Sequence, residues 1–333
     1  MGHRKYSAPR RGSVAFRPRA RAKSLEARVR TWPQMAAGEK NTLLGFAGFK
    51  VGGIHVLTID DREKTPNFGK QLLNAATVIA TPPITIIGIR AYRTDMYGQH
   101  ALFDVYAKDL PKELARRVEI KQADDALAKA EAKVDGASSV MAIAAVSPSD
   151  VGVPQKKPFV FELGVSGKNA RAQFDYVKGL LGKEVKASEV FQLGQNVDVF
   201  GITRGKGVEG PITRFGVKRK QHKSRKSVRA VGTLGPISPA VVMYTVARQG
   251  QRGFHQRTEY NKRILVMSDA AKEGSININP KGGFKHFGLV KGEYIVVRGS
   301  IPGVPKRLIK MRHPIRNIPK KVAEPKVLEV VVE

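Results

Sequence analysis

Residues 43–60 read LLGFAGFKVGGIHVLTID, and this stretch marks the beginning of the folded core. It mixes β-branched and aromatic residues with glycines, a composition typical of strands, and the glycines at 52–53 predict a tight bend. The same kind of pattern continues in residues 80–92 and 99–106, with a hairpin expected around residues 97–98. Together these segments predict a β-rich core.

Further short strands are predicted along the rest of the chain, most of them bounded by Gly, Pro or Asn. They cover residues 140–146, 159–165, 196–202, 263–267, 275–279 and 293–298. Short strands at such intervals favour a β-barrel or a β-sandwich. The chain has 333 residues, of which 41% are apolar, so it is long enough for roughly two domains with a real core.

Two helices interrupt the β pattern. Residues 111–134 carry spaced apolar residues among alternating charges and end before Gly136, which predicts a surface helix. Residues 169–181 place their apolar side chains on one face and precede Gly182, which predicts a second helix. We therefore expect a mixed α/β insert over residues 111–182.

The charge of the chain indicates a polyanionic partner. Lys and Arg number 59 against 28 Asp and Glu, which gives a net charge of +31 and a pI near 10.4. Such self-repulsion is hard to sustain in a free monomer. A membrane surface would attract the same charge, but we find no apolar run of about 18 residues and no apolar centre of a signal peptide. We expect a cytoplasmic protein without a membrane partner.

The basic residues are concentrated in two stretches. Residues 1–30 hold ten Lys or Arg against one acid, Glu26, and residues 204–229 hold ten more against Glu209 alone. Neither stretch has enough apolar surface to offset its ordering entropy, so each needs a partner to become structured. Interleaved Gly, Ser, Pro and Thr allow close approach to phosphates, and nearby aromatic residues can stack on bases. The pattern predicts nucleic-acid binding. A third basic cluster is formed by Lys306, Arg307, Lys310, Arg312, Arg316, Lys320 and Lys321.

Residues 205–261 form an unusually long segment with few strand signals. Ordinary loops in compact domains have about 4 to 6 residues. Within a β domain such a segment is explained if it projects into a nucleic acid. The basic N-terminal stretch and this internal segment together indicate penetration into folded RNA rather than reading of a groove by one helix.

The motifs of catalysis and cofactor binding are incomplete. Gly205, Gly207 and Gly210 form GxGxxG, but Pro211 and basic residues stand where a dinucleotide site requires a helix and, about 20 residues on, an acid. Residues 164–168 (GVSGK) lack the last glycine of a nucleophile elbow, and no Ser or Thr follows as in a Walker loop. The seven histidines show no metal-site spacing, and the absence of cysteine excludes thiolate chemistry. We predict no catalytic residue, no cofactor and no metal.

Long motifs spread over nearly the whole chain carry a family resemblance. They are GHRKYSAPRRGS at residues 2–13, GFAGFKVGGIHV at 45–56, VFGITRGKGVEGPITRFGVKRK at 199–220, VARQGQRGFHQRTEYNKRI at 246–264 and GEYIVVRGSIPGVPKRLI at 292–309. The chain resembles the universal large-subunit ribosomal protein family L-three in its archaeal and eukaryotic form. The short length and the lack of cysteine favour the archaeal form.

The resemblance implies a mainly β fold, namely a translation-protein-type β-barrel with an α/β insert, a long basic N-terminal arm and a long internal loop extension. The expected segments are an arm over 1–42, barrel core over 43–110, the insert over 111–182, barrel over 183–204, the loop extension over 205–261, completion of the barrel over 262–310 and a C-terminal tail over 311–333.

The resemblance also implies a structural role rather than catalysis. Members of the family bind large-subunit rRNA, act early in subunit assembly and send the loop towards the peptidyl transferase centre, where RNA makes the peptide bond. The expected partners are rRNA and neighbouring large-subunit proteins, with one copy per ribosome and no small-molecule substrate. Two rival functions stay open, a free RNA chaperone or mRNA-binding regulator and a nucleotide-dependent RNA-modifying enzyme that uses the GxGxxG glycines.

The expected rRNA contacts combine these basic clusters with aromatic residues. They are Arg4, Lys5, Arg10, Arg11, Arg17, Arg19, Arg21, Lys23, Arg28, Arg30, Trp32, Arg204, Lys206, Arg214, Phe215, Lys218, Arg219, Lys220, His222, Lys223, Arg225, Lys226, Arg229, Arg248, Arg252, Phe254, His255, Arg257, Lys262, Arg263, Lys306 and Arg307. The resemblance places the loop tip at Gly235, Pro236, Ile237 and Ser238. There Ile237 stands where many eukaryotic relatives have tryptophan, and Arg225 replaces a histidine of those relatives, so functions resting on either side chain are not carried over.

Overall fold

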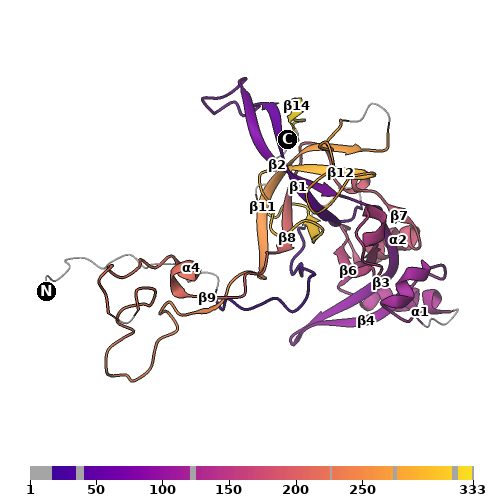
Figure 1. Cartoon of the computed structure of the whole chain (residues 1–333). Helices are drawn as coiled ribbons and strands as arrows, with labels where there is room; N and C mark the ends of the chain where they lie inside the picture. Colours follow the sequence, from indigo (N-terminus) through magenta and orange to yellow (C-terminus); the bar gives the residue numbers. More distant parts are fainter. Residues whose placement is uncertain are drawn as a thin grey trace. The chain divides into compact units, whose positions relative to one another are not determined.

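The computed structural model describes residues 17–34, 41–120, 125–225, 227–272, 276–316 and 322–331. The chain divides into two compact units, and many of their helices and strands are labelled in Figure 1. One unit consists of Met1–Ser24 and Ile202–Gln256, and we call it the basic unit. The other consists of Leu25–Gly201 and Arg257–Glu333, and we call it the β body.

The larger sheet of the β body is antiparallel. Its strands are β1 (Gly45–Ile59), β2 (Gln71–Ala80), β8 (Asn196–Ile202), β11 (Gln256–Asp269), β12 (Glu293–Arg298), β13 (Leu308–Arg312) and β14 (Val327–Val331). They follow the order β13-β8-β11-β12-β2-β1-β14, and β13 also pairs with β1. Strands far apart in the sequence therefore lie side by side, as the neighbouring β2 and β12 show in Figure 1.

The predicted bend at residues 52–53 is an irregularity within one long strand. β1 keeps pairing with β2 on both sides, but the register shifts between Lys50 and Gly52. A Cβ atom at Gly52 would come within 2.6 Å of Cδ1 of Phe284. Glycine is therefore required here because an aromatic ring packs directly against the strand.

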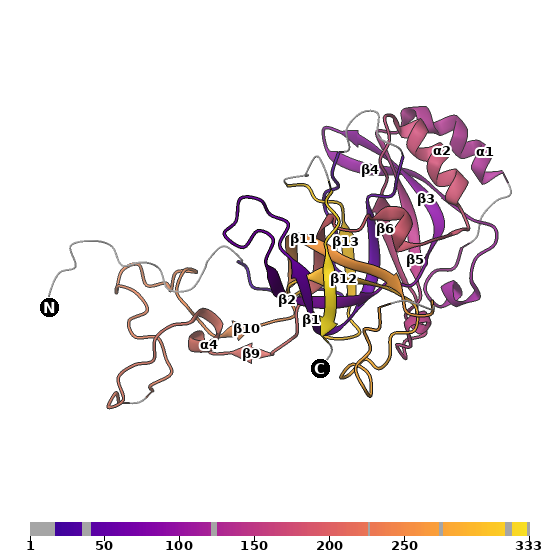
Figure 2. The same cartoon turned by 90° about the horizontal axis from the view of Figure 1, so that it is seen from above.

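A second sheet of the β body is also antiparallel. Its strands are β3 (Ile84–Asp95), β4 (Gly98–Tyr106), β5 (Ser139–Val146), β6 (Phe159–Gly164) and the short β7 (Glu184–Val185). The order is β4-β3-β5-β6, with β7 on β3. Figure 2 shows the helices α1 (Ala126–Lys133) and α2 (Ala170–Leu180) over one face of this sheet. The 3₁₀ helices η1 (Lys112–Arg116), η2 (Val134–Gly136) and η3 (Pro148–Val151) and the short α3 (Ala187–Val190) complete the β body.

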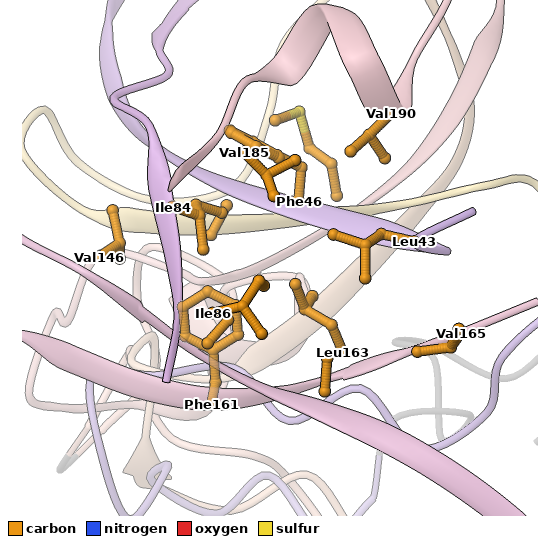
Figure 3. Packing of buried hydrophobic residues seen from close by; sticks show 14 of the residues in the cluster. Leu43, Phe46, Ile84, Ile86, Val146, Phe161, Leu163, Val165, Val185 and Val190 are labelled. Atoms are coloured by element: carbon orange, nitrogen blue, oxygen red, sulfur yellow. The ribbon is translucent and has the colours of Figure 1, made fainter. Parts of the chain in front are cut away.

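Side chains of both sheets share one hydrophobic core. Phe46 of β1 lies in one cluster with Ile84 and Ile86 of β3 and Phe161 of β6, as Figure 3 shows. Phe46, Ile84 and Ile86 are fully buried. Burying each such side chain contributes about 1.5–3 kcal/mol. The two sheets therefore form one folded body rather than two separate domains.

Most of the predicted strands are confirmed. β5, β6, β8 and β12 match their predicted ranges within a residue or so, and Asp95 pairs with Gly98 in the predicted hairpin. β3 and β4 belong to the second sheet, so the sheets divide near residue 84, whereas the sequence suggested a boundary at 111. β11 begins at Gln256 and includes the last residues of the predicted loop.

The single helix predicted over 111–134 is wrong, whereas the helix predicted over 169–181 is confirmed as α2. η1 and α1 are separate elements because their buried residues belong to different clusters. Leu114 of η1 packs in a small cluster with Ile87 and Ile143, and Ala130 of α1 packs in the main core.

The strand predicted over 275–279 is also wrong for its described residues, 276–279, which form no strand. The side chain of Asn279 bonds the backbone of Val290 through both of its polar atoms, Nδ2 to the carbonyl at 3.0 Å and Oδ1 to the N–H at 2.9 Å. This side-chain amide takes the place of a backbone ladder.

Candidate RNA interface

The basic unit carries most of the excess positive charge. Its sequence holds twenty Lys or Arg and a single acid, Glu209. Oε2 of Glu209 accepts a hydrogen bond of 2.7 Å from Nη1 of Arg252. Since this acid is already paired, the other cations of the unit have no carboxylate of their own unit to neutralise them. The unit therefore presents a field that attracts a polyanion.

A short antiparallel ribbon forms the base of the basic unit. β9 (Val208–Glu209) pairs with β10 (Gly250–Gln251). The segments next to them stay paired, because the N–H of Lys206 donates to the carbonyl of Arg252 at 2.9 Å. Gly253 has φ +75°, and a Cβ atom there would lie 2.0 Å from the carbonyl oxygen of Arg204. Glycine thus permits the two segments to approach each other this closely.

Phe215 gathers three arginines of the basic unit. It closes the helix α4 (Pro211–Phe215) and is buried. The guanidinium carbons of Arg19, Arg17 and Arg214 lie 4.0, 4.8 and 5.1 Å from the centre of its ring. Cation–π attraction holds each guanidinium near the ring. The cluster concentrates positive charge that a phosphate would neutralise.

Backbone carbonyls complete the arginine cluster. Nε of Arg214 donates to the carbonyl of Gln251 at 2.9 Å, and Arg19 donates to the carbonyl of Arg214. Burial lowers the pKa of Arg214, and the neighbouring charge of Arg17 lowers that pKa further. Arginine nevertheless stays protonated in proteins. The cluster is therefore a fixed group of like charges, and its repulsion is relieved when an anion binds.

The loop that follows α4 exposes its basic side chains. Lys218, Arg219, His222, Lys223, Arg225, Arg229 and Arg248 are exposed, and Lys220 is half-buried. The predicted tip residues Gly235, Pro236, Ile237 and Ser238 are exposed as well. Ile237 is 96% exposed, so this large apolar side chain has little contact with the rest of its own chain. Arg21, Lys23, Arg204 and Lys206 are exposed near the ribbon.

Several residues predicted to contact RNA make contacts with other residues of the protein. His255 is buried, and its Nδ1 lies 2.8 Å from the carbonyl oxygen of Ala20. Trp32, in the β body, packs against Gly45 and Gly164. Nη1 of Arg263 donates to Oδ1 of Asp61 at 2.7 Å. These contacts hold the protein together, and any contact of the same side chains with RNA stays a prediction.

The remaining predicted contacts of the β body differ in exposure. Lys306, Arg28 and Arg30 are exposed, whereas Lys262, Arg257 and Arg307 are half-buried. Lys262 pairs with Glu259 at 2.6 Å. Burial lowers the pKa of Arg257 and of Arg307. Arg4, Lys5, Arg10, Arg11 and Lys226 lie outside the described residues.

Two members of the third basic cluster form buried ion pairs instead of a surface patch. Nη2 of Arg312 lies 2.8 Å from Oδ2 of Asp198, and both side chains are almost fully buried. Nζ of Lys310 lies 2.9 Å from Oε1 of Glu26. The sequence prediction missed both pairs, although the apolar residues Leu308, Ile309 and Met311 around Lys310 favour a buried strand.

The segment with the GxGxxG glycines does not have the fold that the enzymatic alternative requires. Gly207 lies in the ribbon next to β9, and the helix α4 that follows has only five residues, too short for a dinucleotide fold. Among the described residues, no group of three or more His, Asp or Glu side chains is arranged to hold a metal ion. No helix in the described ranges is long and apolar enough to cross a membrane.

A mainly β body and a separate unit with twenty cations and one acid are typical of ribosomal proteins that have a globular body and a basic extension. The whole chain, residues 1–333, matches the family model described as Ribosomal protein L3, and the chain belongs to this family.

Curated relatives agree with the family model. The chain is 48% identical to large ribosomal subunit protein uL3 of Caldivirga maquilingensis, over 94% of this chain and 91% of the relative. It is 44% identical to uL3 of Methanococcoides burtonii, over 99% and 97% of the two chains, and 43% identical to uL3 of Pyrobaculum aerophilum, over 98% of each. These relatives are named as ribosomal proteins and not as enzymes, and they are mostly archaeal, as predicted.

Proposed function

We propose that the protein is a structural constituent of the large ribosomal subunit that binds large-subunit rRNA through the basic unit. The observation that carries this proposal is the separation of charge, with twenty cations and one acid in the basic unit. Lys and Arg replace the counterions of packed phosphates and so hold together RNA segments that would otherwise repel one another. The relatives are named as proteins of the large ribosomal subunit, which supports the same assignment.

The β body serves as the anchor in this proposal. β13 pairs with both β8 and β1, which supports a closed barrel of six strands, β1, β2, β12, β11, β8 and β13. A closed barrel leaves few free edges for unwanted pairing. The barrel and the second sheet present a rigid surface for neighbouring large-subunit proteins, and one copy of the chain occupies each cytoplasmic ribosome.

The basic arm and the loop extension make the rRNA contacts in this proposal, and the segment 235–238 reaches towards the peptidyl transferase centre. The RNA performs the peptidyl transfer, and the protein organises it during early assembly. The exposed Ile237 contributes apolar contact at the tip and no stacking, because an isoleucine has no ring.

Sedimentation at high salt tests this proposal. Cell lysate is separated on a sucrose gradient, and the protein is quantified across the fractions by mass spectrometry. We expect stoichiometric retention in the large-subunit peak. A variant with Lys218, Arg219, Lys223 and Arg225 changed to Gln should be depleted from this peak. Recovery of the wild-type protein mainly in light fractions would contradict the proposal and favour a free RNA chaperone or mRNA-binding regulator.

A further inference from the structure

Gly205 and Gly207, the first two glycines of the GxGxxG motif, line a concavity in the basic unit. This concavity has a volume of about 570 Å³. Its lining consists of Arg21, Ala22 and Lys23 together with Gly205, Gly207, Gln251 and Phe254. All of these residues belong to the basic unit, which has a single acid.

Backbone hydrogen bonds fix the walls of the concavity. The N–H of Ala22 donates to the carbonyl of Phe254 at 2.8 Å, so residues 21–23 are tied to the ribbon. Within the ribbon, the N–H of Arg252 donates to the carbonyl of Gly207 at 2.9 Å. The site is thus preorganised before any ligand arrives, which lowers the entropic cost of binding.

The conformation of Phe254 adds a second observation. Its φ is +54°, in the left-handed region that residues with a bulky side chain rarely adopt. Backbone strain of this kind concentrates at ligand sites. Gly207 also has a positive φ of +68°, and a side chain there would point into open space. Both positions, each with a left-handed backbone, lie in the lining of the concavity.

The groups around the concavity match the parts of a nucleotide. A phenylalanine ring is a stacking surface for any base, and guanidinium and ammonium groups bind phosphate. Nε2 of Gln251 donates to the carbonyl of Gly253 at 2.9 Å, which directs the amide and leaves its oxygen as an acceptor for a base edge.

We propose that this concavity binds one unpaired nucleotide of RNA, with the base stacked on Phe254 and the phosphate facing Arg21 and Lys23. The inference rests on the proposed rRNA binding and specifies the RNA element that the site takes. A base within a duplex is stacked on both sides and cannot enter, whereas a bulged base can be splayed out. A free dinucleotide is not favoured, since Glu209 is bound to Arg252 and is not available for a ribose.

The test compares two RNA hairpins that differ by one bulged 2-aminopurine, bound by the full-length protein at elevated salt. We expect the bulged hairpin to bind roughly ten-fold or more tightly than the fully paired hairpin, with a change in 2-aminopurine emission. Phe254→Asn should abolish this preference, because asparagine tolerates a positive φ but has no ring. Phe254→Tyr should keep the preference.

A glycine variant tests the backbone beside Phe254, since a Cβ atom at Gly205 would lie 3.6 Å from Cβ of Phe254. Gly205→Val should fill the concavity and also abolish the preference, whereas Gly232→Val, on the loop away from the concavity, should not. A preference that persists in both Phe254→Asn and Gly205→Val would overturn the assignment. Competition by free AMP with the affinity of the bulged hairpin would also overturn it, in favour of a mononucleotide site. Failure of the wild-type protein to bind either hairpin would instead contradict the proposed rRNA binding itself.

Discussion

Nζ of Lys310 lies 2.9 Å from Oε1 of Glu26, although 284 positions separate the two residues in the sequence. Lys310 is buried on the central strand β13, and its ammonium group also lies 4.5 Å from the centre of the Phe161 ring. Glu26 is the only acid among the first thirty residues. This acid therefore pairs with a buried cation and ties the segment that follows the basic N-terminal stretch to the β body.

Glu26→Gln should destabilise the β body by about 3 kcal/mol, because it leaves the charge of Lys310 buried without its partner. Burial lowers the pKa of Lys310, and Glu26 opposes this shift. With Glu26 removed, the folded-state pKa should fall further below that of the unfolded chain. The lost stability should then return partly as the pH rises towards about 10, where Lys310 is neutral. Urea unfolding at several pH values measures this change.

Glu131→Gln is the matched control for this variant. Glu131 pairs with Lys178, and both side chains of that pair are nearly half exposed. Exposed pairs contribute little, so we expect a change within about 0.5 kcal/mol. Equal effects of the two substitutions would show that burial does not strengthen the pair of Glu26 and Lys310.

Phe215→Leu should loosen the segment that carries Arg17 and Arg19. Leucine keeps an apolar side chain in the buried position but removes the ring that attracts three guanidinium groups, each contact being worth about 0.5–2 kcal/mol. We expect trypsin to cleave after Arg19 roughly ten times faster than in the wild-type protein, as followed by mass spectrometry of the released peptide.

Phe68→Leu provides the comparison, because Phe68 is an exposed aromatic residue of the β body. It should leave cleavage after Arg19 unchanged. Unchanged cleavage in Phe215→Leu as well would mean that the ring does not hold the arginines in place.

Neutralising four exposed cations of the loop should change the salt dependence of RNA binding. If Lys218, Arg219, Lys223 and Arg225 each contact a phosphate, changing all four to Gln should reduce the slope of log K against log salt by about 3, on single-stranded terms. Titration of an rRNA fragment from 50 to 400 mM KCl measures the slope. About ten such contacts in the wild-type protein predict a slope near −7.

A variant with the same loss of charge separates local contacts from net charge. Lys129, Lys133, Lys156 and Lys157 are exposed on the β body, and their change to Gln also removes four positive charges. We expect the slope to change by less than about 1, since these side chains lie outside the basic unit. The same change in both variants would argue against specific phosphate contacts by the loop.

The stability of the β body should fall below neutral pH because of His313. This histidine is buried, and its Nδ1 lies 2.6 Å from Nε2 of Gln195. Burial lowers the pKa of His313 from the ordinary value of 6.5. The unfolded chain therefore takes up a proton before the folded chain does, and stability is lost as the pH falls through about 6.5.

Chemical unfolding at pH 7.5 and at pH 5.5 tests the role of His313. The wild-type protein should be less stable at the lower pH, and His313→Gln should show a smaller difference between the two values. Asp60, whose pKa is lowered chiefly by its hydrogen bond from Arg62, affects stability only below about pH 4 and does not interfere in this window. An unchanged pH dependence in His313→Gln would exclude the histidine as the cause.

Local sequence patterns predicted the mainly β character, most but not all of the individual strands, and the basic stretches. These properties depend on neighbouring residues, since strand propensity, glycine stops and clusters of like charge are read over a few positions. The family resemblance could also be found in the sequence, because motifs such as residues 199–220 are continuous in the chain. Local patterns did not predict which sheet β3 joins, because its pairing with β5 depends on contacts between distant segments.

Only the tertiary structure decided which charges are exposed and which are buried in ion pairs. In the sequence, Lys310 and Arg312 belong to the third basic cluster. In the folded chain, Glu26 and Asp198 pair with them inside the β body. The three arginines around Phe215 and the concavity beside Phe254 likewise join residues near the N-terminus to residues some 190 to 240 positions later. Chain composition predicts the total charge, but burial and distance determine the electrostatic role of each side chain, and both exist only in the folded chain.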